Sequence, residues 1–361
     1  MTRRTFHVLA ASAAAASGAG KQVKTALITH ADGPHLSAYL PSLATAQEAG
    51  PVVLADASGT VEAAARKALG SKLTGVYRDT GEMLRKEKPE FALVTMAADV
   101  APPPIRAALE AGCHVLAEKP ACVRPADFDA LAALAKKNNR QFVLALANRI
   151  DPLVVESRRL MKSGLVGKVF GVEIHIVADQ TRLTRPAYRE QWFAKKERAG
   201  GGHLIWLGIH WLDLAVYLTG SRVRDVAGFI ANVGGQPLNV EDSATAALRF
   251  DNGSLGTITS GYYVDKGYHT QIKIWGSDGW LELRKHGAPV PLEWYSNKEG
   301  KVRRYEGPLE PNGYEPFVRH IVRAAAGLEQ PVLDTADCQH ALHAVFAAYR
   351  AAETGQAQKV S

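Results

Sequence analysis

The sequence predicts an α/β protein of two domains, an N-terminal doubly wound parallel sheet followed by a C-terminal α+β domain with an open, mostly antiparallel sheet. In the first part of the chain, short apolar runs alternate with helical patterns, which is typical of βαβ units. From residue 148 on, strand candidates follow one another and are joined by turns such as Asp251-Asn252-Gly253, which is typical of hairpins. With 361 residues, 47% of them hydrophobic, the chain is long enough for both domains.

The N-terminal half supplies the elements of the parallel sheet in turn. We expect strands at residues 23–29, 51–58, 91–97, 114–120 and 141–149. Helices are expected between them at residues 35–50, 61–71, 82–90, 102–112 and 127–139. Because each parallel pair needs a crossover connection, this order predicts a sheet covered by helices.

The C-terminal half begins with a helix at 151–167 and a long strand at 167–178. In that strand Val172, Ile174 and Ile176 alternate with Glu173 and His175, which predicts one buried and one exposed face. A helix is expected from residue 203 on, and late helices at 315–326 and 335–354, of which the last can pack back on the first domain. Further strands are expected at 225–233, 243–251, 254–263, 271–277, 279–285 and 291–296.

The first twenty residues are typical of an export signal. A paired Arg3-Arg4 is followed by a short apolar run and small residues, and the run is too short to span a bilayer. The order T-R-R-x-F resembles the twin-arginine signal, which predicts a periplasmic protein without a membrane anchor. The alternative is an Ala-rich leader of a cytoplasmic protein. We therefore divide the chain into a signal peptide at 1–20, a dinucleotide-binding domain at 21–147 and a substrate domain at 148–361.

Charge and cysteine content exclude several classes of partner. The net charge is +7, but Lys and Arg are spread along the chain and form no run interleaved with aromatic residues, so we expect no nucleic-acid partner. Cys113, Cys122 and Cys338 have neither zinc-ligand nor disulfide spacing, and they are predicted to be small core residues.

The loop after the first strand is the predicted dinucleotide site, because parallel sheets bind ligands beyond the carboxyl ends of their strands. The expected G-x-G-x-x-G is reduced here to the stretch from Thr29 and His30 to a single Gly33. The N-terminus of the following helix can still bind a diphosphate. Asp56 ends the second strand, where an acid hydrogen-bonds the adenosine ribose and disfavours a 2′-phosphate, so it predicts NAD over NADP. The alternative is that Asp56 caps the next turn.

Several motifs resemble the glucose-fructose oxidoreductase/inositol dehydrogenase family (Gfo/Idh/MocA). The match includes Glu118-Lys119-Pro120 after a strand, ANRIDP at 147–152, SGLVGKV at 163–169, the three glycines at 200–202, G-x-H-x-x-D at 208–213 and VEDSATAALRFDNGSLG at 240–256. The resemblance covers nearly everything after the leader. It implies a Rossmann domain and a two-domain NAD(P)-dependent enzyme that acts on sugars or cyclitols, with its site between the nicotinamide and the open sheet.

The resemblance also implies the site residues. Lys119 would orient the reacting hydroxyl and help its proton leave, and His210 would be the acid/base beside it. The cofactor would contact Thr29, His30, Asp56, Thr95, Glu118 and Lys119, although Met96 replaces the proline that the family has after Thr95. The chemistry agrees, because oxidising an alcohol needs a base near the hydroxyl, and a lysine can stabilise the developing alkoxide.

The helix after the three glycines carries the predicted substrate face. Residues 203, 206, 210 and 213 are spaced by three or four, so they are expected to share one helical face at the cleft. The family normally has Asp at position 206, and here Trp206 offers a stacking surface instead. Weaker candidates are Arg185 and Arg189 in the loop at 181–192. The predicted substrate-binding residues are Arg149, Glu173, His175, Trp192, His203, Trp206 and Asp213.

Three functions are consistent with these residues. The first is an NAD-dependent oxidoreductase that acts on a sugar, cyclitol or glycoside hydroxyl and keeps its cofactor tightly bound. The second is a glycoside lyase or hydrolase that uses transient NAD redox or a metal, with Glu173, His175 and His203 as possible metal ligands. The third is a non-catalytic sugar-binding protein. Family resemblance implies a dimer or tetramer.

Overall fold

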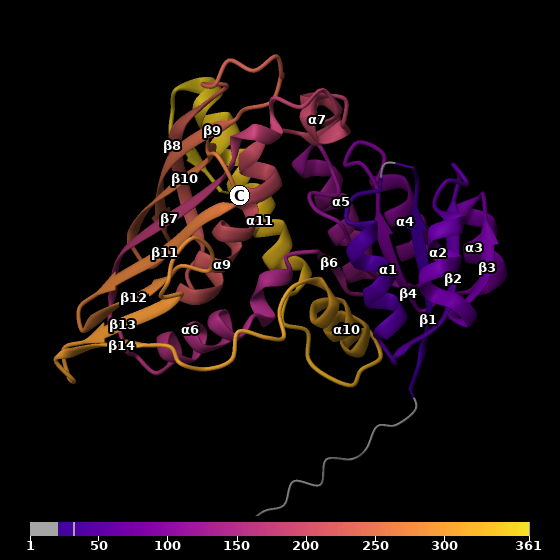
Figure 1. Ribbon diagram of the computed structural model, residues 1–361, viewed down its shortest axis with the longest axis horizontal. Coiled ribbons are helices and arrows are strands. Elements are labelled where there is room, and N and C mark those ends of the chain that lie inside the picture. Colours follow the sequence, from indigo (N-terminus) through magenta and orange to yellow (C-terminus); the bar gives the residue numbers. More distant parts are fainter. Residues whose placement is uncertain (1–20, 32, 361) are drawn as a thin grey trace, which may run out of the picture.

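The computed structural model describes residues 21–31 and 33–360, and it confirms the predicted fold class (Figure 1). The predicted export signal at 1–20 lies outside these residues. A six-stranded parallel sheet and a nine-stranded, mostly antiparallel sheet form the two ends of the molecule, and helices lie between and around them. Within the described ranges no helix is both long and apolar enough to cross a membrane.

The first sheet has the strand order β3-β2-β1-β4-β5-β6, and every neighbouring pair is parallel. The five predicted strands are confirmed: the first has its predicted bounds, the second begins and ends two residues earlier, and the other three are shorter. β3 was not predicted, because its sequence LTGVY is short and only half-buried at the sheet edge. The strands are β1 Val23–Thr29, β2 Ala49–Asp56, β3 Leu73–Tyr77, β4 Phe91–Thr95, β5 His114–Ala117 and β6 Phe142–Leu144.

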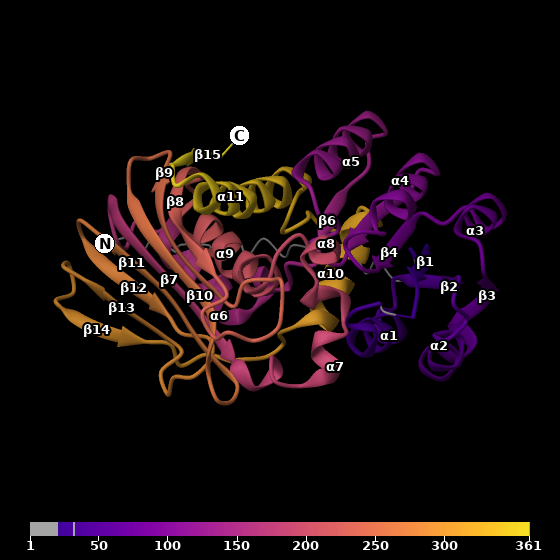
Figure 2. The same ribbon diagram turned by 90° about the horizontal axis from the view of Figure 1, so that it is seen from above.

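Helices cover both faces of this sheet, as a doubly wound fold requires (Figure 2). α1 (Leu36–Thr45) and α2 (Glu62–Leu69) lie on one face. α3 (Thr80–Glu87), α4 (Pro102–Glu110) and α5 (Pro125–Lys137) lie on the other. α1 is shorter than predicted because its expected last residues, Ala49 and Gly50, begin β2. Because β1, β4 and β5 are parallel neighbours, their carboxyl ends lie at the same edge of the sheet.

The second sheet has the order β14-β13-β12-β11-β7-β10-β9-β8-β15. All neighbours are antiparallel except β7 and β10, which are parallel. The short outer strands β14 and β15 were not predicted, since their residues are polar and mostly exposed. The strands are β7 Val169–Asp179, β8 Val223–Ala231, β9 Ser243–Phe250, β10 Leu255–Val264, β11 Tyr268–Gly276, β12 Gly279–Leu283, β13 Leu292–Ser296, β14 Lys301–Arg304 and β15 Gln358–Lys359.

Three helices cover the inner face of this sheet: α6 (Pro152–Lys162), α9 (Ile209–Thr219) and α11 (Thr335–Thr354) (Figure 1). Val172, Ile174 and Ile176 point toward them, which confirms the predicted alternation in β7. No helix of residues 21–31 and 33–360 lies on the outer face (Figures 1 and 2). Two short helices, α7 (Pro186–Arg189) and α8 (Lys196–Ala199), lie in the segment between β7 and α9.

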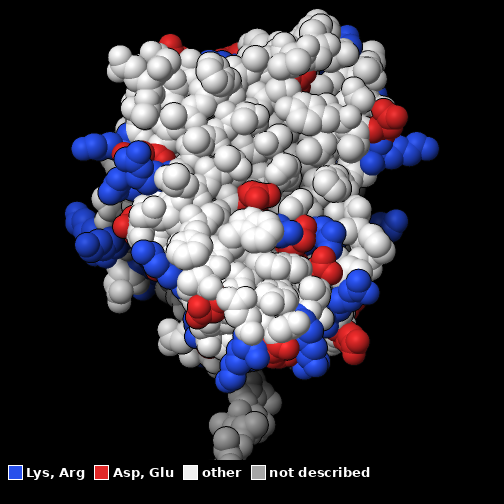
Figure 3. All heavy atoms as spheres, turned by 90° about the vertical axis from the view of Figure 1, so that its left-hand side faces the viewer, with Lys and Arg blue, Asp and Glu red and all other residues white. Residues whose placement is uncertain are grey.

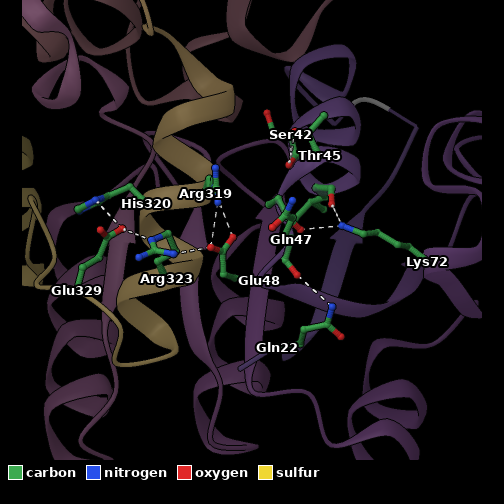
Figure 4. Close-up of polar contacts among 12 residues, drawn as sticks. Gln22, Ser42, Thr45, Gln47, Glu48, Lys72, Arg319, His320, Arg323 and Glu329 are labelled. Atoms are coloured by element: carbon green, nitrogen blue, oxygen red, sulfur yellow. Dashed lines mark hydrogen bonds and ion pairs between the residues drawn. The ribbon is translucent and has the colours of Figure 1, made fainter. Parts of the chain in front are cut away.

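Two late helices of the second domain pack against the first domain. α11 packs against α5 and β6 as well as β8, and α10 (Tyr314–Ala325) packs against α1. Figure 4 shows the ionic part of the second contact: Glu48, just before β2, accepts hydrogen bonds from Arg319 and Arg323 of α10. Although burial raises the pKa of Glu48, these hydrogen bonds hold it at about 2. The packing therefore fixes the cleft between the domains.

Candidate active site

A cavity of about 300 Å³ lies where the carboxyl ends of the first sheet face the inner side of the second. Both domains line it, and their contributions come from widely separated segments of the chain. The lining residues are His35, Lys119, Ala147, Asn148, Ile176, Arg182, Trp206, Leu207, His210, Trp211, Tyr268, His286, Gly313 and Tyr314.

Lys119 follows β5 and reaches this cavity although its side chain is only 1% exposed. Its Nζ donates a hydrogen bond of 2.6 Å to the backbone carbonyl of Trp206 and lies 3.2 Å from the centroid of the Trp206 ring. Burial lowers the pKa of Lys119 to about 7, and the charge of Glu118, with Oε1 at 3.9 Å, only partly opposes this. Lys119 therefore exchanges its proton near neutral pH.

His210 lines the same cavity from the first turn of α9. Burial and the nearby charge of Lys119 lower its pKa well below the usual 6.5, so the imidazole is neutral at neutral pH. Its Nδ1 is buried and has no hydrogen-bond partner among the residues that the structure describes. An unpaired buried polar atom at a cavity is suited to a hydrogen bond with a bound molecule.

Glu118 lies fully buried behind Lys119. Its Oε2 accepts a hydrogen bond from Tyr39 Oη and lies 3.2 Å from His35 Nδ1, while no described residue bonds its Oε1. Burial raises the pKa of Glu118, but His35 and Lys119 outweigh it and the pKa is lowered. The Glu118 carboxylate thus lies close to the amine of Lys119 and favours the protonated form of that amine.

Residues on either side of the turn between β1 and α1 pack against the end of β4. Thr29 Oγ1 donates to the Thr95 carbonyl (2.9 Å), and Thr95 Oγ1 donates to the Pro34 carbonyl. A Cβ at Gly33 would lie 2.2 Å from Thr29 Oγ1 and 2.8 Å from the Thr95 carbonyl oxygen, so only glycine fits there. Thr29 and Thr95 are buried by this packing, and His30 Nε2 accepts from the Ala97 amide (3.3 Å). The hydroxyl groups of both threonines thus make hydrogen bonds within the protein.

Asp56 also departs from its predicted role. Its side chain is fully buried; Oδ1 accepts from the amide (3.0 Å) and hydroxyl (2.5 Å) of Ser58, and Oδ2 accepts from the Val61 amide (2.8 Å). Burial raises the pKa of Asp56, but these hydrogen bonds lower it overall. Asp56 therefore makes the contacts that the capping alternative predicts.

Trp206 lies at the cavity, but protein groups already cover its indole ring. His35 stacks on it (centroids 5.8 Å apart, 11° between planes), Phe193 stacks at 5.2 Å, and Lys119 Nζ lies over the ring. The expected stacking surface for a sugar ring is therefore wrong. Trp206 instead holds the Lys119 amine, through its carbonyl and through a cation–π contact.

The predicted single helical face is also wrong, because residues Leu204–Gly208 form a π-helical turn before α9. A π-helical turn is wider than an α-helical one, so spacings of three or four no longer align side chains across it. Trp206 and His210 reach the cavity, whereas His203 is buried against Ser260 (Nδ1 to Oγ 2.6 Å). Trp192 is likewise buried, against Trp206 and Phe193, and does not line the cavity.

Arg149 and Asp213, both predicted to bind substrate, bind each other. The guanidinium makes two hydrogen bonds to the Asp213 carboxylate (3.0 and 2.5 Å) and one to Asp337 of α11 (2.6 Å). Arg149 is 3% and Asp213 2% exposed, and neither lines the cavity. Burial raises the pKa of Asp213 even though Arg149 opposes this. The ANRIDP and G-x-H-x-x-D motifs are thus joined by a buried ion pair.

Glu173 and His175 do not reach the cavity either, because they project from β7 opposite to Ile176, which lines it. Glu173 accepts a hydrogen bond from Trp275 Nε1 (2.8 Å) on the outer side of the sheet. Neither residue lies in a metal-binding arrangement, since no group of three or more His, Cys, Asp or Glu in the described ranges is placed to hold a metal ion.

Several cavity residues were missed by sequence reasoning. Arg182 and Tyr268 are 86 positions apart, and the pairing of β7 with β11 brings them together (Arg182 Nη2 to Tyr268 Oη 2.8 Å). His35 and Tyr314 meet because α10 packs on α1 (Oη to Nδ1 3.3 Å). No local motif marks these residues, since long-range packing alone places them at the site.

A Rossmann-type domain joined to an open-sheet domain, with a lysine and a histidine at a cavity lined by both, defines a two-domain dehydrogenase architecture. Residues 34–146 match the model for the oxidoreductase family with an NAD-binding Rossmann fold, and residues 154–282 match the model for the GFO/IDH/MocA C-terminal domain. The chain belongs to the Gfo/Idh/MocA family of NAD(P)-dependent oxidoreductases.

Individual relatives agree with this assignment. The myo-inositol dehydrogenase Hyg17 of Streptomyces leeuwenhoekii is 26% identical over 273 residues, which are 74% of this chain and 79% of that protein. An oxidoreductase domain protein from Kribbella flavida has a TM-score of 0.82 at 24% identity, covering 95% of this chain and 100% of that one. The WlbA dehydrogenase from Bordetella pertussis, solved with NADH and UDP-GlcNAcA, has a TM-score of 0.79 at 18% identity, covering 94% and 99%. These structures share the fold.

Proposed function

We propose that the protein is an NAD-dependent dehydrogenase that oxidises a hydroxyl group of a sugar, cyclitol or glycoside and keeps its cofactor tightly bound. The observation that carries the proposal is the meeting of Lys119 and His210 at one cavity between the two domains. Relatives named as a myo-inositol dehydrogenase and a D-glucoside 3-dehydrogenase support the substrate class.

The residues present fit a nicotinamide dinucleotide at the edge of the parallel sheet. Gly33 lets the loop after β1 lie close to Thr29 and the Thr95 carbonyl, and Glu118 Oε1 is a buried acceptor without a hydrogen-bond partner in the described structure. The backbone of residues 33–35 at the start of α1 would hold the diphosphate, and Glu118 would accept a hydrogen bond from a cofactor hydroxyl. The bound nicotinamide supplies the oxidant, which takes up the hydride from the substrate carbon.

Lys119 is the better candidate for the base that takes the hydroxyl proton. A base acts best when its pKa lies near the working pH; Lys119 meets this condition, whereas His210 has a pKa too low. Once protonated, the ammonium is stabilised by Glu118, by the Trp206 carbonyl and by the indole ring. His210 then provides a neutral hydrogen bond that orients the reacting oxygen.

Turnover with a carbohydrate panel tests this function. We expect purified protein supplied with NAD⁺ to form NADH and a keto product in equal amounts from at least one sugar, cyclitol or glycoside. Cleavage of a glycoside without net NADH would support the lyase or hydrolase alternative instead. Binding of sugars with neither NADH nor any product would support the non-catalytic alternative.

A second copy of the chain is our proposal for what covers the outer face of the large sheet. Figure 3 shows this face, where charged side chains gather at the edges and leave a broad uncharged area. Phe229, Leu255 and Trp275 project from it with exposures of 86%, 59% and 38%. An exposed apolar surface of this kind is typical of an interface, and sedimentation analysis would distinguish dimer or tetramer from monomer.

Export by the twin-arginine route is likewise a proposal. It rests on the sequence of residues 1–20 alone, and a periplasmic location would require the folded protein to carry its cofactor across the membrane. Fractionation of cells that produce the full chain, with Arg3→Lys/Arg4→Lys as the comparison, would test it.

A further inference from the structure

Arg182 is the one side chain among the described lining residues of the cavity that stays cationic when Lys119 acts as a base, and none of these lining residues is Asp or Glu. The remaining titratable nitrogen groups of the lining are the imidazoles of His35, His210 and His286.

Arg182 is the cation best placed to bind a ligand. It ends the short turn Gln180–Arg182 directly after β7, and its guanidinium lies 4.9 Å from the Tyr268 ring centroid and donates to Tyr268 Oη (2.8 Å). No carboxylate of the described residues lies within ion-pair distance of it. The charge of Asp179 is near enough to help raise the pKa of Arg182, but the Asp179 carboxylate accepts its hydrogen bonds from the Thr181 amide (2.8 Å) and hydroxyl (2.6 Å).

The guanidinium therefore retains most of its hydrogen-bonding capacity. Arg carries five N–H donors in a planar fork that matches a carboxylate, and the contact to Tyr268 uses one of them. Tyr268 also fixes the position of the group, because its ring lies under the guanidinium. A positioned, half-buried arginine without an ion pair to any described carboxylate is suited to an anion supplied by the ligand.

The rest of the cavity suits a monosaccharide. Its volume is about 300 Å³, and Ile176, Leu207 and Trp211 provide apolar surface for the carbon face of a sugar ring. Asn148 lines it too, with its Oδ1 already engaged by Lys285 (2.8 Å). The hydrogen-bond donors and cationic groups of the lining that have no other partner suit a ligand rich in hydroxyl groups.

We propose that the substrate is a sugar acid, whose carboxylate pairs with Arg182 while the hydroxyl to be oxidised lies at Lys119. The proposal rests on the proposed dehydrogenase function for the fate of that hydroxyl, but the carboxylate contact can be tested by binding alone. Arg182 is then the residue that sets specificity for acidic over neutral sugars.

Binding of matched acids and amides tests the charge directly. Calorimetric titration of the purified full chain with D-glucuronate, D-galacturonate and D-gluconate is compared with titration by the corresponding uncharged amides and by D-glucose. We expect at least one acid to bind about tenfold or more tightly than its amide, which is the usual magnitude for a charge-assisted pair. The advantage should shrink as salt concentration rises.

Variants assign the effect to one side chain. Arg182→Gln should remove the preference for the acid and leave the affinity for the amide unchanged, whereas Arg182→Lys should retain part of it. Arg106→Gln, at an exposed arginine of α4 that does not line the cavity, is the control and should behave like the wild type. Equal thermal unfolding midpoints of all three variants would show that each is folded.

The outcomes separate this proposal from the proposed function. Acid-selective binding that depends on Arg182, without NADH formation, would support the proposal and count against the dehydrogenase. NADH formation from a neutral sugar, with no preference for any acid, would overturn the proposal and leave the dehydrogenase intact. Preference for D-glucose 6-phosphate over every carboxylate would also overturn it, because the anion would then be a phosphate.

Discussion

Replacement of Lys119 by methionine is expected to lower kcat/KM by about a hundredfold to ten-thousandfold, the usual contribution of a positioned acid or base. Methionine fills the same buried space but cannot take the proton of the substrate hydroxyl. Lys119→Arg should not restore activity, because a guanidinium stays protonated. Lys196→Met, at an exposed lysine whose ion pair with Glu353 is 3.4 Å long, is the control and should retain full activity.

The pH dependence follows from the lowered pKa of Lys119. Below about 7 the amine is protonated and cannot act as a base, so kcat/KM of the wild type should fall as the pH drops through this value and reach a plateau above it. His210→Asn should lower the rate without moving the midpoint, because the buried imidazole is neutral across this range. A midpoint that stays in place when Lys119 is removed would contradict the assignment of the base.

Replacement of Arg149 by methionine is expected to destabilise the fold by about 3–5 kcal/mol, the usual cost of removing one partner of a buried ion pair. The Asp213 carboxylate, 2% exposed, would lose both hydrogen bonds that Arg149 donates to it. Asp337 would lose its contact as well. Urea unfolding of the wild type and the variant gives the difference in free energy.

A double-variant cycle distinguishes the buried charge from a packing defect. Arg149→Met combined with Asp213→Leu should recover a large part of the lost free energy of unfolding, because the buried, unpaired carboxylate of Asp213 is then absent. Arg159→Met breaks an exposed ion pair with Glu156 and should cost no more than about 1 kcal/mol. A double variant less stable than Arg149→Met alone would show that the charge of Asp213 is not the cause.

Most of the fold could be predicted because long elements bury regular apolar faces. β7 shows this well, since the alternation of Val172, Ile174 and Ile176 with polar residues matches its buried and exposed sides. β3, β14 and β15 escaped prediction because they are short and lie at or next to the sheet edges, where packing imposes a weaker pattern. The π-helical turn before α9 also left no trace in the residue pattern.

The site was predictable only where a motif ends a strand or begins a helix. Lys119 and His210 reach the cavity as predicted, because the motifs that carry them lie at such points. Arg149 and Asp213 were misassigned because a charged residue looks the same in sequence whether it binds a ligand or a partner 64 positions away. Arg182 was missed because the strand pairing that completes its surroundings is a long-range event.

The central claim is that a nicotinamide dinucleotide binds above the strand ends beside Lys119. Calorimetric titration of the full chain with NAD⁺, after any copurifying nucleotide has been removed and identified by mass spectrometry, tests this most directly. We expect one NAD⁺ per chain, and loss of binding in Gly33→Val, whose side chain would displace Thr29 and the Thr95 carbonyl from the loop. A chain that retains no dinucleotide on purification and takes up none at millimolar NAD⁺ would contradict the claim.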